Sequence, residues 1–194
     1  MSPNISETES SASPEANKQL VKRYFDAMER GQLDDAVAFW APVSLNYASG
    51  RYGQTSPRGR DGMAIGFRML RTAFPDRRFE IDDMIAEDDR VVCRMTVSGT
   101  FGATPERPPW EVPSGWVGVE STELIPKAAF GKAYSVKHIH IFRIANRLIT
   151  EHWAARDDLG LLLQLGAIVP ASLTRKHDGS STYRLGVAPS MVGR

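Results

Sequence analysis

Two long stretches in the second half of the chain alternate apolar and polar residues with a period of two. The first is FEIDDMIAEDDRVVCRMTVSGTF, residues 79–101, and the second is AYSVKHIHIFRIANRLITEHWAA, residues 133–155. Alternation of this kind is typical of strands that bury one face, and a short polar turn interrupts each stretch. The sequence therefore predicts two strand pairs, with turns at Glu87–Asp89 and Ala145–Arg147.

Helical spacing dominates the first half of the chain. Apolar residues recur every three or four positions from Gln19 to Trp40, and a break at Gly31 predicts two short helices. The run SLNYAS suggests a short strand after them. A third helix is expected beyond the polar loop GRYGQTSPRGR, with Asp61 as its cap and Pro75 as its end, because proline cannot continue the backbone hydrogen bonding.

These elements predict an α+β fold in which about three N-terminal helices pack on a curved, mainly antiparallel sheet and enclose a pocket. We expect a disordered leader at residues 1–18, one domain at 19–166 and a C-terminal tail at 167–194 that wraps the surface or stays disordered. Within the domain, the Pro- and Trp-rich residues 103–133 form an excursion, with one short strand near 116–120.

Composition excludes several classes of protein. The 194 residues include 24 basic and 23 acidic ones, and a net charge of +1 argues against nucleic-acid binding. The longest apolar run, at 159–170, is too short to span a membrane, and the first residues lack the apolar core of a secretory signal. We therefore expect a cytoplasmic protein without membrane partners. The single cysteine, Cys93, excludes an internal disulfide and is expected to be buried.

The chain carries, in this order, the sequences Phe-Pro-Asp, Ser-Gly-Thr, Arg-Ile followed by Glu-His-Trp, and Gln-Leu-Gly. In this set, and in the segment LVKRYFDAMERGQLDDAVAFWAP, it resembles the SnoaL-like polyketide cyclases of the nuclear-transport-factor-2-like (NTF2-like) superfamily, over residues 19–102 and 134–166. The resemblance implies a cone-shaped α+β barrel around a hydrophobic pocket, often a homodimer through the outer face of the sheet. It also implies an intramolecular aldol ring closure of a polyketide ester without metal or organic cofactor.

Two features depart from the pattern of these cyclases. The acid/base aspartate that follows Glu-His-Trp in them is replaced by Ala154 in this chain. The excursion is also longer than the connection typical of the family, and it is a candidate lid over the pocket mouth. The familiar proton-transfer carboxylate is therefore missing from its position.

Three of the four histidines lie in the second strand pair. Alternation places His138, His140 and Phe142 on one face of the first strand. On the second strand, Leu148, Thr150, His152 and Ala154 share a face, opposite Ile149, Glu151 and Trp153. An odd number of residues in the connecting loop would bring His152 to His140, whereas an even number would set His140 against the face of Trp153.

Aldol cyclisation needs a base for the proton α to a carbonyl and a donor for the resulting oxyanion. A neutral histidine can serve either role near neutral pH. We expect His140 first and His138 second as catalytic residues, with Asn46 or Tyr24 as oxygen-binding donors. The residues expected to line the substrate pocket are Tyr24, Trp40, Asn46, Phe67, Phe142 and His152.

Other interpretations of the same residues stay open. Each histidine can equally be a satisfied structural residue, and the aromatic residues can be plain core. Asp157 either caps the closing helix or replaces the missing carboxylate. A metal held by His138 and His140, with Glu151 or His152 as a third ligand, is the weakest interpretation, and we expect neither metal nor cofactor.

The sequence thus supports three hypotheses. The leading one is a cofactor-independent cyclase or isomerase of a hydrophobic polyketide-type carbonyl compound. The second is a non-catalytic small-molecule-binding or dimeric module that has lost its acid at Ala154. The third is a metal-dependent lyase or isomerase.

Overall fold

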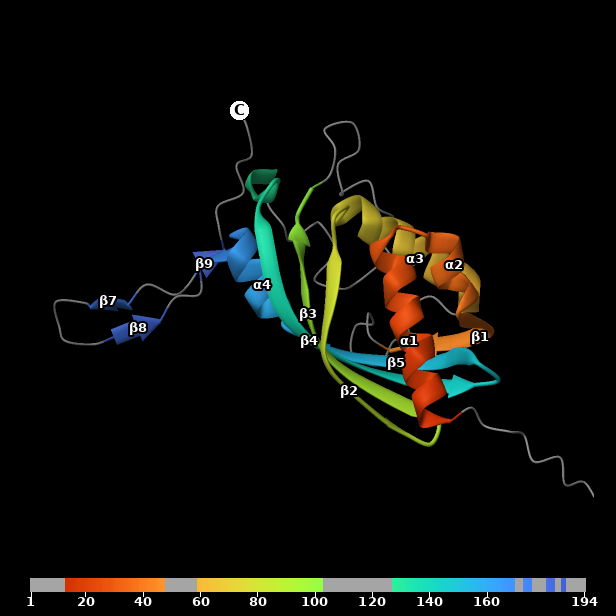
Figure 1. The fold of residues 1–194 in the computed structure, drawn as a ribbon. Coiled ribbons are helices and arrows are strands. Elements are labelled where there is room, and N and C mark those ends of the chain that lie inside the picture. Colours follow the sequence, from red (N-terminus) through yellow and green to blue (C-terminus); the bar gives the residue numbers. More distant parts are fainter. Residues whose placement is uncertain are drawn as a thin grey trace, which may run out of the picture.

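The computed structural model describes residues 13–47, 59–102, 127–169, 173–175, 181–183 and 186–187. Its main elements are α1 (Pro14–Glu29), α2 (Leu33–Ala38), β1 (Trp40–Asn46), α3 (Gly59–Ala73), β2 (Arg78–Glu87), β3 (Arg90–Thr100), a 3-10 turn (Lys127–Ala129), β4 (Ala133–Ala145), β5 (Leu148–Arg156) and α4 (Asp158–Leu165). Five strands form one sheet in the order β1-β5-β4-β3-β2, with β1 parallel to β5 and all other pairs antiparallel. Figure 1 shows the long strands curving, with α1 to α3 on one side. The predicted α+β fold is confirmed.

The first helix begins earlier than expected. Ser13 accepts a hydrogen bond from the backbone N–H of Ala16 at 3.2 Å. Pro14 occupies the first helical position, where a backbone N–H would have no acceptor within the helix, so its absence costs nothing. Residues 14–18 are thus helical, which corrects the C-terminal end of the expected leader; residues 1–12 lie outside the described residues. Gly31, with φ of 72°, follows the end of α1, and the predicted break there is confirmed.

Two local expectations in this half are wrong. Trp40 begins β1 instead of ending the second helix, which stops at Ala38. Asp61 lies in the first turn of α3 instead of capping it, because the helix already starts at Gly59. The C-terminal end of α3, at Ala73 and just before Pro75, agrees with the prediction.

Both hairpin turns form where expected. Asn146 and Arg147 connect β4 to β5 with φ of 50° and 61°, as in the two-residue turns that match the twist of a hairpin. A two-residue turn alone would oppose His140 to Trp153. The register shifts, however, between Arg143, which pairs with Glu151, and Ile144, which pairs with Ile149.

Thr150 is therefore an extra residue in β5, a β-bulge, and its hydroxyl donates to the Arg143 carbonyl at 3.2 Å. The bulge pairs His140 with Ala154 and Phe142 with His152, so these side chains share one face. Ile149, on the turn side of the bulge, pairs with Ile144 and also lies on this face, where its side chain is fully buried. This corrects the expectation that Ile149 and His152 point to opposite faces.

Aromatic side chains occupy the space between the helices and the sheet. The Tyr24 ring lies 5.9 Å from Trp40, 6.0 Å from Phe67 and 5.9 Å from Phe142, measured between centroids. A cavity of about 10 Å³ beside this cluster, lined partly by Phe67 and Phe79, has room for one water molecule at most. Cys93 is buried as predicted, and burial raises the pKa of its thiol to about 12.

The described parts of the tail form two small sheets. The first pairs β6 (Ile168–Val169) with β9 (Gly186–Val187), and the second pairs β7 (Leu173–Arg175) with β8 (Ser181–Tyr183), beyond α4 in Figure 1. The excursion, up to residue 126, and its expected strand lie outside the described residues. No helix in the described ranges is long and apolar enough to cross a membrane.

Truncation of a side chain on each of the two faces of β4 should change stability by very different amounts. Phe142 is fully buried, whereas Ile139, on the other face, is 44% exposed. Phe142→Ala should lower the free energy of unfolding by about 3–5 kcal/mol, because it removes a ring and leaves a cavity. Ile139→Ala, the matched control, should change it by about 0.5 kcal/mol or less. Urea denaturation measures both, and equal losses would contradict the assignment of the faces.

Candidate active site

Three histidine rings and one asparagine amide form a continuous row on the inner face of the sheet. His138 Nδ1 lies 3.3 Å from His140 Nε2, and His140 Nδ1 lies 2.8 Å from His152 Nε2. The row ends where His152 Nδ1 lies 3.0 Å from Asn46 Oδ1. All four residues are buried, with exposures of 3, 8, 7 and 5% respectively. We call this set the histidine row.

Three separate features of the chain assemble the row. Alternation along β4 puts His138 and His140 on one face, and the bulge at Thr150 turns His152 toward them. The parallel pairing of β1 with β5 then sets Asn46 beside His152. Each imidazole nitrogen inside the row thus finds a partner without water, which satisfies the rule that buried polar groups are hydrogen-bonded.

The asparagine amide sets the direction of the hydrogen bonds. Asn46 Nδ2 lies 3.5 Å from the Met63 sulfur, so its Oδ1 faces His152 and accepts the Nδ1 proton. His152 Nε2 must then accept from His140 Nδ1, and His140 Nε2 must accept from His138 Nδ1. In this arrangement each neutral ring carries its proton on Nδ1. His138 Nε2 is then the acceptor nitrogen of the row that lies furthest along it from Asn46.

Burial keeps the inner part of the row uncharged. Burial is the largest cause that lowers the pKa of His140 well below its ordinary value, and neighbouring His152, His138, Arg77 and Arg156 lower it further. Burial, with a smaller contribution from Arg156, lowers the pKa of His152 to about 3. Both rings are thus neutral at physiological pH, the state in which an imidazole accepts a proton.

Two arginines near the row were not predicted. Arg156 pairs with His138 across the β4–β5 register and forms an ion pair with Asp158 at 3.2 Å, with 10% of its own side chain exposed. Arg77 lies over the rings of Phe74 and Phe79, 5.6 and 5.4 Å from their centroids. Extending the alternation of β5 two residues beyond Ala154 would have found Arg156, whereas Arg77 follows a loop and carries no such signal.

The predicted aromatic residues surround the row. Phe142 stacks on His152 at 4.7 Å, and Trp40 meets the same ring edge-on at 5.8 Å. Tyr24 and Phe67 lie one layer further in, against Trp40, and burial raises the pKa of the Tyr24 hydroxyl. The structure brings Trp40, Phe142 and Asn46 to the histidines and leaves Tyr24 and Phe67 as packing partners of the ring cluster.

The Asp157 carboxylate is engaged at the start of α4. Its Oδ1 accepts a hydrogen bond from the Gly160 backbone N–H at 2.8 Å, so it caps α4, which confirms one of its two interpretations. The position of the missing aspartate is occupied by Ala154, directly opposite His140 in the register. A carboxylate at position 154 would share a face with the histidines.

The acidic side chain that was considered as a metal ligand points elsewhere. Glu151 Oε1 lies 2.7 Å from the guanidinium of Arg143, on the opposite face from His152. Across the described portion of the chain, no three histidine, cysteine or acidic side chains form a group suited to a metal ion.

Solved structures with the same fold include three proteins from Streptomyces. TsrD of Streptomyces laurentii is 26% identical, with a TM-score of 0.58, over 80% of this chain and 98% of that one. AclR of Streptomyces galilaeus, a proposed hydroxylase, is 23% identical, with a TM-score of 0.59, over 79% of this chain and 98% of its own. IdmH of Streptomyces antibioticus, a proposed polyketide cyclase, is 21% identical, with a TM-score of 0.58, over 77% of this chain and 98% of that one.

An NTF2-like protein of Burkholderia pseudomallei also matches, at 19% identity and a TM-score of 0.55, over 77% of this chain and 97% of that one. The fold is thus NTF2-like. No curated protein matches the chain. The family model for SnoaL-like polyketide cyclases matches residues 18–165, and the chain belongs to that family.

The lowered pKa values of His140 and His152 predict a loss of stability in mild acid. Because both folded-state pKa values lie below the ordinary 6.5, this contribution is complete above about pH 6.5 and is lost as the pH falls. The free energy of unfolding should decrease by up to about 1.4 kcal/mol per pH unit for each histidine.

Urea denaturation between about pH 6.5 and 5 tests this, in a window above the ordinary range of carboxylates. The variant His140→Gln/His152→Gln should be less stable at neutral pH but should show a flatter pH dependence. An unchanged slope in this variant would mean that other groups cause the acid loss.

Proposed function

We propose that the chain is a cofactor-independent enzyme that removes a proton α to a carbonyl of a hydrophobic, polyketide-type compound and closes a ring by aldol addition or a related isomerisation. The histidine row is the observation that supports this proposal. Its rings are buried and hydrogen-bonded in a fixed order, and His140 and His152 are held neutral by burial. Family membership supports the substrate class.

In the proposed reaction, His138 Nε2 takes the α-proton and leaves an enolate. The enolate carbon then attacks a second carbonyl carbon of the same molecule, which forms the carbon–carbon bond, and the resulting alkoxide takes the proton back from His138. While His138 is protonated, its Nδ1–H donates to the neutral His140 Nε2, 3.3 Å away, and this hydrogen bond stabilises the imidazolium. No oxidant or reductant is consumed.

Arg156 is the proposed electrostatic partner of the oxyanion. It lies on the same face as His138, and the side chains of Arg156 and of its ion-pair partner Asp158 are 10 and 28% exposed. A guanidinium at this place stabilises negative charge on the substrate oxygen more strongly than in water, because it is mostly buried. We therefore place the substrate at this end, with His140, His152 and Asn46 as positioning residues.

The outer face of the sheet supports a homodimer as part of the proposal. Ile139 of β4 and Ile85 of β2 are 44 and 64% exposed there. A second copy that covered this face would remove both side chains from water.

The base assignment predicts a large loss on replacement of His138. In deuterium oxide, the enzyme should exchange the α-protons of a β-keto polyketide methyl ester, as measured by mass spectrometry. His138→Gln keeps a polar side chain but no base, and the exchange rate should fall by about 10²- to 10⁴-fold. The control is Lys137→Gln, whose side chain is 65% exposed on the other face and should leave the rate unchanged. A fully active His138→Gln variant would exclude His138 as the base.

A second function, small-molecule binding without turnover, is favoured by Ala154. The position opposite His140 carries a methyl group in place of an acid. A site of this kind would still select its ligand but would no longer catalyse the reaction of that ligand.

Ala154→Asp separates the two functions. A carboxylate opposite His140 favours the imidazolium form, and exchange should accelerate by about tenfold or more if the row is catalytic. Ala155→Asp, on the exposed outer face, is the matched control. Ligand binding by calorimetry without exchange in either form would instead establish the binding module.

A further inference from the structure

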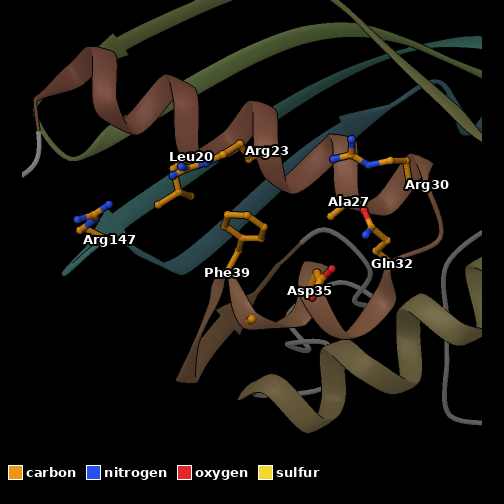
Figure 2. Close-up of a pocket in the computed structure, with 9 residues that line it drawn as sticks. Leu20, Arg23, Ala27, Arg30, Gln32, Asp35, Phe39 and Arg147 are labelled. Carbon is orange, nitrogen blue, oxygen red and sulfur yellow. The ribbon is translucent and has the colours of Figure 1, made fainter.

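A groove of about 600 Å³ runs along the outer side of the helical layer. α1 forms one wall, α2 with the following Phe39 forms the other, and Arg147 of the β4–β5 turn closes one end. Figure 2 shows the Phe39 ring between Arg147 on one side and Arg30 on the other. On the sheet-facing side of α1, Phe25 contacts His140. The groove is therefore distinct from the histidine row.

The spacing of residues along α1 explains the shape of the groove. Leu20, Arg23, Ala27 and Arg30 follow one another at intervals of three, four and three, which places them in one stripe of the helix. The small side chains of Ala27 and, from α2, Ala38 leave the space between the two helices open. Leu20 and Phe39 supply an apolar floor.

The charges around the groove are unbalanced. Arg23, Arg30 and Arg147 line it against a single acidic residue, Asp35, although the whole chain is nearly neutral. In the ranges that the structure covers, none of these three guanidinium groups forms an ion pair or a side-chain hydrogen bond. Arginines on the sheet behave differently: Arg94 pairs with Asp82 and Arg143 with Glu151. Among the described residues, the groove thus presents three cations and one acidic residue beside apolar surface.

We propose that this groove is a second binding site, for a small organic anion that has an aromatic or acyl body and a carboxylate or phosphate head. Guanidinium groups bind both heads through paired hydrogen bonds, and the Phe39 ring and Leu20 contact the body. The volume lies within the range of about 300–1,000 Å³ that small-molecule sites occupy. Gln32 adds an amide that can bind a hydroxyl or carbonyl of the same ligand.

Titration of the full chain with three naphthalene derivatives, followed by amide NMR, tests this site without any assay of activity. Naphthoate and naphthyl phosphate should shift the signals of α1, Phe39 and Arg147. Neutral acetylnaphthalene should bind with an affinity that is lower by at least about tenfold. Tighter binding of the phosphate would indicate a phosphorylated ligand, and tighter binding of naphthoate a carboxylic acid. Equal binding of the neutral compound, or shifts confined to other elements, would overturn the proposal.

Two variants and a matched control complete the test. Arg23→Gln/Arg147→Gln removes two groove charges and should weaken naphthoate binding by about tenfold. Ala38→Leu keeps every charge and should abolish binding by filling the groove, at an exposed position where folding is not at risk. Arg68→Gln/Arg78→Gln changes the net charge equally at exposed sites outside the groove and should leave the affinity unchanged. Unaltered binding in both groove variants would refute the site.

Discussion

The interior of this protein depends on a single extra residue in β5. With only the two-residue turn at Asn146 and Arg147, the strand would present Trp153 to the interior and His152 to the outside. The bulge at Thr150 reverses this, because one added residue exchanges the two faces of a strand. The histidine row and the stacking of Phe142 on His152 both follow from that shift in register.

The row is a set of polar groups that satisfy one another. Burying an imidazole without a partner is costly, and each ring here replaces water with the nitrogen of the next ring. The amide of Asn46 ends this sequence and gives it a direction. The same burial that lowers the pKa of His140 and His152 thus leaves these two rings neutral and hydrogen-bonded in a fixed order.

Much of the fold follows from local patterns that the sequence displays. Alternation located both hairpins, and Gly31 and Pro75 marked helix ends, because these signals act through the backbone of a few neighbouring residues. The errors have tertiary causes. Trp40 fits a helical spacing but joins β1, where its indole is fully buried against Tyr24 and His152. Asp61 is a good cap in isolation, yet the helix begins before it.

The sequence by itself determined the α+β class, the family, and the common face of His138 and His140, since these depend on composition, order and a period of two. Only the tertiary structure decided that His152 joins them, through a bulge that no local propensity specifies. It also decided which residue ends the row, because Asn46 lies 106 positions away from His152 in the sequence. Contacts between such distant residues arise from strand pairing and packing, which the order of residues does not display directly.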